Sequence, residues 1–194
     1  CNFCAIQLHQ GRRVTSRSAD SIVAEAERMT HEPDFKGYIH DIGGPTANFR
    51  FPSCREQMIR GMCTGGKHCL APKTCPHVIV DHSDYLKILR RVRELPGVKK
   101  VFIRSGIRFD YLMSDPDDTF FKELVEYHVS GQLKVAPEHC APNTLAYMGK
   151  PPIETFNKFK DKFYELSKKA GKKQYLVPYL MSSHPGSTLK DAVY

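Results

Sequence analysis

The chain has 194 residues and a formal charge of +8, from 29 lysines and arginines against 21 acids. This length is enough for one domain with a sizeable hydrophobic core, and the positive charge favours anionic partners without identifying one. No stretch has the make-up of a signal peptide or the roughly 18 consecutive apolar residues of a membrane span, so we expect a soluble cytoplasmic protein, or a piece of one.

The cysteines are numerous, and their number is odd, so a framework of disulfides is not expected. In a reducing compartment, clustered thiols are more often metal ligands or redox groups than crosslinks. The seven are Cys1, Cys4, Cys54, Cys63, Cys69, Cys75 and Cys140.

The first four residues, Cys1-Asn2-Phe3-Cys4, place two thiols three positions apart. Thiols at this spacing can reach one metal centre, because the two residues between them let the backbone turn around it. The spacing alone fits an iron-sulfur cluster, a zinc site and a dithiol redox motif equally well.

Helix and strand signals alternate after a basic loop at residues 9–18. A helix is predicted from Ser18 or Asp20 until Pro33 stops it. A strand at 37–42 follows and ends in Gly43-Gly44-Pro45, where the backbone can approach a ligand closely. The apolar stripe of this helix comprises Ile22, Val23, Ala26 and Met29.

The alternation of helix and strand signals stops at residues 46–80. These residues are rich in cysteine, proline and glycine and have no periodic pattern of apolar residues, so we interpret them as an insertion. Helix signals resume at Ser83, with Pro96-Gly97 as the terminator, and a strand at 100–106 comes next. The apolar face of this second helix comprises Leu86, Leu89, Val92 and Leu95.

The second half of the chain continues the alternation. A helix over 120–128 leads to a strand at 132–136 that stops against Pro137, and a long helix leads to a strand at 174–181. A turn at 183–188 then opens a last helix. The long helix has Phe156, Phe159, Phe163 and Leu166 at helical spacing, with Gly171 just past its end.

This alternation is typical of right-handed crossover units on a parallel sheet, and the last three strands start about 30 to 40 residues apart, as such units require. The step from the first strand to the second is about twice as long, and the insertion accounts for the excess. The sequence therefore predicts an α/β fold, with the insertion outside the sheet on the carboxyl side of the strands. Ligand chemistry in such folds gathers beyond the carboxyl ends of the strands. Those ends carry 43–45, 104–108, 137–139 and 182–186.

The insertion has four cysteines in the pattern C-x8-C-x5-C-x5-C. Four thiols can close a zinc site or hold a second iron-sulfur cluster, and a segment this poor in apolar residues could use a metal as its core. Unligated thiols, or a disulfide formed on purification, are the alternatives. The four are Cys54, Cys63, Cys69 and Cys75.

The N-terminal motif resembles the end of the radical S-adenosylmethionine (SAM) motif, C-x-x-x-C-x-aromatic-C, with Phe3 in the aromatic position. Residues 10–18 and 184–188 are similar to segments of the radical SAM methylthiotransferases. The broadest resemblance is to the YgiQ-type radical SAM proteins. It is carried by 40–48, 105–108, 134–139 and 174–179.

The resemblance implies one radical SAM core domain over residues 1–194, a partial TIM barrel that lacks its first and last strands. The first cysteine of the motif, expected four places before Cys1, is absent, so we expect an internal fragment that is inactive alone.

The resemblance also implies the cofactors and their ligands. Cys1 and Cys4 would bind a [4Fe-4S] cluster, whose fourth iron takes the amino and carboxylate groups of SAM. Glu138 is the candidate for the ribose hydroxyls, although it could instead cap the next helix or pair with a lysine. Pro45 stands where the family has an acid, so contact with the SAM amino group would be through the backbone. The residues implied for SAM are Phe3, Gly43, Gly44, Ser105 and Glu138.

The implied activity is reductive cleavage of SAM to a 5′-deoxyadenosyl radical that acts on an unknown substrate, with an electron donor such as flavodoxin or ferredoxin. No residue is singled out as reacting with that substrate. Arg12, Arg13 and Arg17 could neutralise the cofactors or contact a macromolecular substrate. The alternative function is a zinc-stabilised nucleic-acid-binding module without catalysis.

Overall fold

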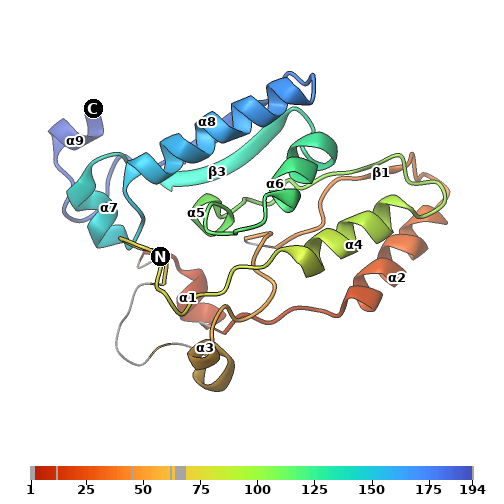
Figure 1. Cartoon of the computed structure of the whole chain (residues 1–194), viewed down its shortest axis with the longest axis horizontal. Helices are drawn as coiled ribbons and strands as arrows, with labels where there is room; N and C mark the ends of the chain where they lie inside the picture. Colours follow the sequence, from red (N-terminus) through yellow and green to blue (C-terminus); the bar gives the residue numbers. More distant parts are fainter. Residues whose placement is uncertain (1–2, 12, 45, 62, 64–68, 194) are drawn as a thin grey trace.

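Helices alternate with short parallel strands along the chain, as the sequence predicts (Figure 1). The computed structural model describes residues 3–11, 13–44, 46–61, 63 and 69–193. The strands are β1 (Tyr38–Ile39), β2 (Lys100–Val101), β3 (Gln132–Glu138) and β4 (Tyr175–Leu180). The helices are α1 (Ile6–His9), α2 (Ala19–Thr30), α3 (Arg55–Arg60), α4 (Ser83–Arg93), α5 (Phe109–Leu112), α6 (Thr119–Glu123), the π-helical turn η1 (Leu124–His128), α7 (Pro142–Met148), α8 (Ile153–Lys169) and α9 (Leu189–Val193).

Both strand pairs in the described part of the chain are parallel. β1 lies beside β2, with Ile39 opposite Val101, and β3 lies beside β4. A parallel bridge between Ile107 and Val135 joins the two pairs. The described residues form no closed barrel, so the partial TIM barrel stays a prediction.

The start of α2 matches its sequence signal. The Ser18 hydroxyl accepts a hydrogen bond from the Ser21 backbone N–H at 3.2 Å, which satisfies one of the free N–H groups at the helix start. The helix ends at Thr30, so the prediction that it continues until Pro33 is wrong by less than a turn. α2 packs against α4, and its buried residues are Val23 and Ala26.

The hydrophobic core lies between α8, α6 and the strands. Phe159 and Phe163 of α8 are fully buried, and the Phe159 ring stacks on Phe121 with 5.2 Å between ring centroids. Burying one such side chain stabilises the fold by about 1.5–3 kcal/mol. The predicted end of α8 is confirmed, because Gly171 lies just beyond it at φ 64°, a conformation that glycine adopts at low cost. The spacing of the apolar residues in α8 therefore predicted correctly which face of the helix packs against the core.

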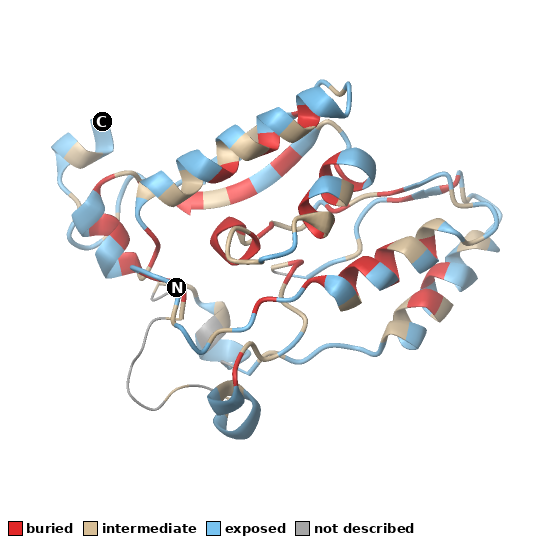
Figure 2. Cartoon of the chain, viewed as in Figure 1, coloured by how far each residue is buried: buried red, intermediate tan, exposed pale blue. Residues whose placement is uncertain are grey.

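β3 is longer than predicted. The prediction that Pro137 ends this strand is wrong, because β3 continues through Pro137 to Glu138 with an irregular register between Val135 and Glu138. Proline is tolerated at such an irregularity, where its missing N–H is not needed. Figure 2 shows the alternation of buried and exposed residues along β3, whose carboxyl end is buried.

β1 and β4 are the edge strands of the two pairs. β4 is exposed along most of its length, and the side chains of Tyr179 and Leu180 are 63% and 62% exposed. Apolar side chains on an unpaired edge are unusual for a finished sheet. Among the described residues, the edge of β4 therefore exposes apolar side chains.

The predicted helix over 120–128 is split into α6 and η1. The turn brings His128 inward, where its Nδ1 contacts the Val101 carbonyl oxygen at 2.9 Å. Among the residues that the structure describes, no helix combines the length and apolar character that crossing a membrane would require.

Candidate functional site

The loops after β1 and β2 are joined by Asp41. Its carboxylate accepts hydrogen bonds from the backbone N–H groups of Arg104 and Ser105, at 2.9 and 3.0 Å, and from the Ser105 hydroxyl. A methyl group on Gly43 would lie 2.9 Å from the Ser105 hydroxyl oxygen, whereas one on Gly44 would meet nothing within 4 Å. Gly43 is therefore required by close packing, and the backbone at Gly44 is open to a ligand. Ser105 links the loops, and its hydroxyl proton is directed at Asp41.

Glu138 has the most unusual environment of the predicted site residues. It adopts φ 72° at the carboxyl end of β3, where it is only 7% exposed. Oε1 lies 3.5 Å from Lys150 Nζ, and Oε2 has no hydrogen-bond partner among the described residues. A non-glycine residue in this conformation costs about 1–3 kcal/mol, and a buried carboxylate oxygen without a donor adds to that cost. Strain and an unpaired oxygen in one residue are typical of a ligand-binding position.

Charged side chains surround Glu138. Lys150 is buried and donates to the Ala136 carbonyl oxygen at 2.8 Å. Burial and the nearby Arg108 lower the pKa of Lys150, while Glu138 and Asp110 oppose that shift. Arg108 donates to both carboxylate oxygens of Asp110, at 2.6 and 2.9 Å. Two cationic and two anionic side chains thus lie close together at this end of β3.

Two other roles were considered for Glu138, a cap of the next helix and an ion pair with a lysine. The residue that precedes α7 is Ala141, and no side chain caps that helix, so the helix-cap interpretation is wrong. The lysine pairing is present at Oε1 but leaves Oε2 free. Pairing with Lys150 therefore explains the position of Oε1 but provides no donor for Oε2.

A buried polar network positions the Arg108 backbone. Asn48 Oδ1 accepts from the Arg108 N–H at 2.8 Å, and Asn48 Nδ2 donates to the Arg108 carbonyl oxygen at 3.1 Å. Nδ2 also lies 3.2 Å from His82 Nε2, while His82 Nδ1 contacts Asp115. Burial lowers the pKa of His82, although Asp115 opposes the shift. A neutral ring that donates from Nδ1 and accepts at Nε2 satisfies both contacts.

Phe3, in the described part of the N-terminal motif, lies at the same end of the sheet. The ring of Phe3 meets His184, in the loop after β4, edge to face at 5.8 Å between centroids. Cys4 is half-buried and is a free thiol, whereas Cys1 lies outside the described residues. The structure thus brings Phe3 to the loop at the carboxyl end of β4.

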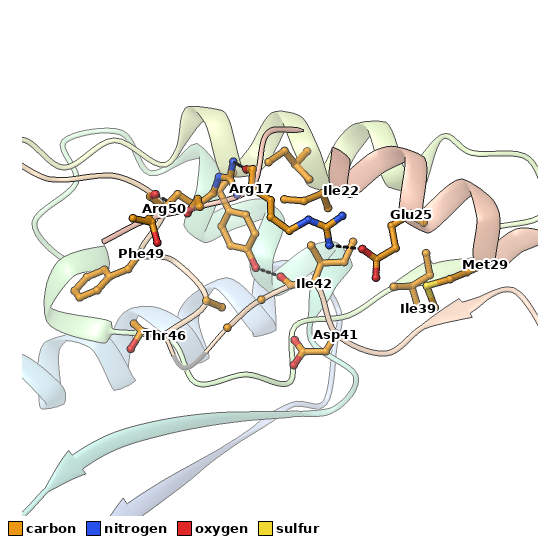
Figure 3. A pocket seen from close by; sticks show the side chains of 18 residues that line it. Arg17, Ile22, Glu25, Met29, Ile39, Asp41, Ile42, Thr46, Phe49 and Arg50 are labelled. Carbon is orange, nitrogen blue, oxygen red and sulfur yellow. Dashed lines mark hydrogen bonds and ion pairs between the residues drawn. The ribbon is translucent and has the colours of Figure 1, made fainter. Parts of the chain in front are cut away.

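A pocket of about 380 Å³ lies between α2, α4 and β1 (Figure 3). Gly43 and Gly44 line it, but Glu138 and Phe3 do not. Arg17, which pairs with Glu25, is among its lining residues. Its other wall is the apolar face of α2 over the edge of β1. The pocket is therefore separate from the surroundings of Glu138.

The cysteines of the insertion are free thiols. Cys54 is buried, and Cys63, Cys69 and Cys75 are half-buried. No three His, Cys, Asp or Glu side chains in the described ranges are arranged to hold a metal ion. Cys140, next to His139, is half-buried and lies outside the insertion.

Sequence reasoning missed the network of Asn48, His82 and Asp115, and the buried Lys150. Their partners lie far away in the sequence, and Asn48 and Arg108 are separated by 60 positions. The sequence contains no signal for them, because the burial of polar residues becomes visible only in the folded chain.

The fold and site define an α/β protein of parallel strands with a polar site at their carboxyl ends. The chain is 64% identical over 193 residues to a UPF0313 protein of Clostridium perfringens (strain SM101 / Type A), a match that covers 100% of this chain and 29% of the relative. It is 59% identical to a UPF0313 protein of Clostridium botulinum (strain Okra / Type B1), with 30% of that relative covered. The chain thus spans less than a third of these relatives. No protein-family model matches it.

Proposed function

We propose that this chain is part of a YgiQ-type radical SAM enzyme, which uses a [4Fe-4S] cluster to cleave SAM reductively and acts on an unknown substrate. The observation that carries the proposal is the buried, strained Glu138, with one unpaired carboxylate oxygen at the carboxyl end of β3. The relatives are more than three times as long as this chain, so the proposal concerns the longer protein.

Glu138 suits a ligand with neighbouring hydroxyl groups. An ionised carboxylate only accepts hydrogen bonds, and its two oxygens can accept from the two hydroxyls of a ribose. Lys150, 3.5 Å from Oε1, restricts the orientation of the carboxylate. Oε2 is left to receive a donor from the ligand.

The backbone at Gly44 suits the amino end of the same ligand. The loop is held in place by Asp41, and among the described residues no atom beyond its chain neighbours lies within 4 Å of where a Cβ on Gly44 would be. Carbonyl oxygens on such a loop can accept hydrogen bonds from an ammonium group. This contact replaces the acid that the family has at the position of Pro45.

The chemistry of the donor set fits an iron-sulfur cluster, because Cys4 offers a free thiol next to Phe3. When bound, the cluster supplies the electron that breaks the sulfonium of SAM. The chain's own residues bind and orient the cofactor and exclude water from it. Cys1 and a cysteine that precedes it in the longer protein would complete the ligand set.

The test uses the longer protein, reconstituted anaerobically with iron and sulfide. We expect a brown protein with broad absorption at roughly 400 nm, and formation of 5′-deoxyadenosine from SAM after addition of dithionite. Cys4→Ala should abolish this product, whereas the matched control Cys140→Ala should retain it. Iron-loaded protein that leaves SAM intact would overturn the proposal. Colourless zinc protein with salt-dependent RNA binding would favour the nucleic-acid-binding alternative.

A further inference from the structure

The loop after β4, residues 182–188, is attached at two points to the segment that carries Glu138. Just before the loop, the Met181 N–H donates to the Glu138 carbonyl oxygen at 2.7 Å. Farther along, the Gly186 carbonyl oxygen accepts from Asn143 Nδ2 of α7 at 3.3 Å. Because α7 is the next helix after Glu138, both attachments lead back to the same part of the chain.

Gly186 lies close against α7. Its φ is 91°, a conformation that glycine adopts at low cost. A methyl group at this position would lie 2.6 Å from the Tyr147 ring, so any side chain would force the ring or the loop to move. The loop therefore needs glycine here, both for its backbone conformation and for its approach to α7.

Hydrogen bonds within the loop fix its conformation. Ser187 Oγ accepts from the His184 N–H at 3.1 Å and donates to the His184 carbonyl oxygen at 2.7 Å. The Ser187 N–H donates to the same carbonyl oxygen at 2.9 Å. These bonds close a turn around Pro185 and Gly186, so the backbone of His184 is held on both sides.

The His184 ring is oriented as well. Its Nδ1 lies 2.8 Å from the Pro185 carbonyl oxygen, and because a carbonyl oxygen only accepts, Nδ1 carries a proton. The ring meets Phe3 edge to face, with 5.8 Å between centroids and 83° between the ring planes. This arrangement is attractive, because the positive edge of one ring meets the negative face of the other.

The segment around Phe3 has little local structure to hold it. The helix that follows Cys4, α1, is only four residues long and has no side-chain cap, and a helix this short is not stable by itself. Phe3 is half-buried. Its contact with the anchored loop therefore contributes to fixing where this segment lies.

We propose that His184 is a positioning residue, which holds the Phe3 ring and the adjoining Cys4 segment at the carboxyl end of β4. The inference rests on the proposed function, because there Phe3 is among the residues assigned to SAM. His184 acts through Phe3 and is not a catalytic residue. Through the anchored loop, it connects Glu138 at the end of β3 to the N-terminal part of the same site.

The first test measures SAM cleavage by the longer protein, reconstituted with iron and sulfide. His184→Ala should raise the KM for SAM about fivefold and leave kcat unchanged, because the lost ring contact weakens binding of SAM. Its iron content should equal that of the wild type, because the thiolates hold the iron.

Two matched variants make this test specific. His184→Phe keeps a ring beside Phe3 and should restore the KM of the wild type, and His31→Ala, at an exposed position after α2, should not change it. An unchanged KM in His184→Ala would overturn the proposal. So would an equal rise of KM in His184→Ala and His184→Phe, or a loss of iron in His184→Ala.

A second measurement needs no SAM, so its outcome is separable from the proposed function. A fluorine-labelled phenylalanine at position 3 of the longer protein reports the surroundings of this ring by fluorine NMR. We expect its resonance to shift in His184→Ala but not in His31→Ala. An unchanged resonance in His184→Ala would overturn the proposal even if the protein cleaves SAM, whereas a shifted resonance in protein that leaves SAM intact would support the positioning of Phe3 and contradict the proposed function.

Discussion

The body built from α4, α6, α8 and the strands and the cysteine-rich insertion are held together in opposite ways. Phenylalanine rings fill the body, where Phe120, Phe121, Phe159 and Phe163 are at most 2% exposed. The insertion encloses thiols and polar contacts, with a small apolar cluster at its edge. The body therefore depends on apolar burial, whereas the insertion has much less of it.

The two regions meet at the network of Asn48, His82 and Asp115. The His82 ring is 2% exposed and stacks on Phe120 of the body, with 4.6 Å between ring centroids. Asn48, at the start of the insertion, holds the Arg108 backbone. Asn48 and His82 are therefore among the residues that connect the insertion to the body.

The largest effect is expected in the interior of the body. Phe159→Ala should lower the free energy of unfolding by about 3–5 kcal/mol, because the ring is fully buried and its removal leaves a cavity. The matched change in the insertion, Phe51→Ala, should cost less than about 1 kcal/mol, because Phe51 is 53% exposed. Urea unfolding measures both, and similar losses would remove the distinction between the regions.

The next effect is a pH dependence that arises in the body. Burial lowers the pKa of His128 from 6.5 to about 4, and its Nε2 has no partner among the described residues. Between these pH values the unfolded chain binds more protons than the folded one, so stability falls as pH falls from 6.5 to 4. A shift of this size corresponds to about 3 kcal/mol.

His128→Asn is the variant that isolates this effect. An asparagine amide can still donate to the Val101 carbonyl oxygen, but it does not titrate. Unfolding free energies at pH 7 and pH 4.5 should therefore differ less in the variant than in the wild type. An unchanged difference would show that His128 is not the group responsible.

A smaller effect is expected where the regions meet. Asn48→Ala removes both contacts with the Arg108 backbone and leaves buried polar groups unpaired, so we expect a loss of about 2 kcal/mol. Asn157→Ala, on the exposed side of α8, is the control and should be nearly neutral. Thermal unfolding compares the two, and equal values would mean that the network does not couple the regions.

The smallest effect concerns the ligand site. Glu138→Gln keeps the shape of the side chain but replaces one acceptor oxygen with a donor. We expect SAM to bind about tenfold more weakly to the iron-loaded longer protein, which corresponds to about 1.4 kcal/mol. Unfolding should change little, because the variant removes a buried charge that is incompletely paired. Glu154→Gln, at the exposed start of α8, should bind SAM normally.

Local signals predicted much of the fold. The cap at Ser18 and the phenylalanine spacing of α8 depend on neighbours within a turn or two, and both are confirmed. The continuation of β3 through Pro137 was missed, because the irregular register that accommodates the proline depends on pairing with β4. The π-helical turn at His128 likewise leaves no distinct pattern in the sequence.

The site was predictable only in outline. The position of Glu138 at the carboxyl end of a strand was predicted, but its positive φ and its contact with Lys150 become visible only in the folded chain. The contact of Phe3 with His184 joins opposite ends of the chain. Such long-range contacts have no local signature, because the chain must fold before they form.

The central claim is that SAM binds to an iron-sulfur cluster at the carboxyl end of these strands, with Glu138 among its contacts. Electron paramagnetic resonance of the dithionite-reduced longer protein tests it most directly, because a ligand that binds to the cluster changes the signal. We predict a changed spectrum when SAM is added to the wild type and a weaker response in Glu138→Gln. A cluster whose spectrum is the same with and without SAM would contradict the account.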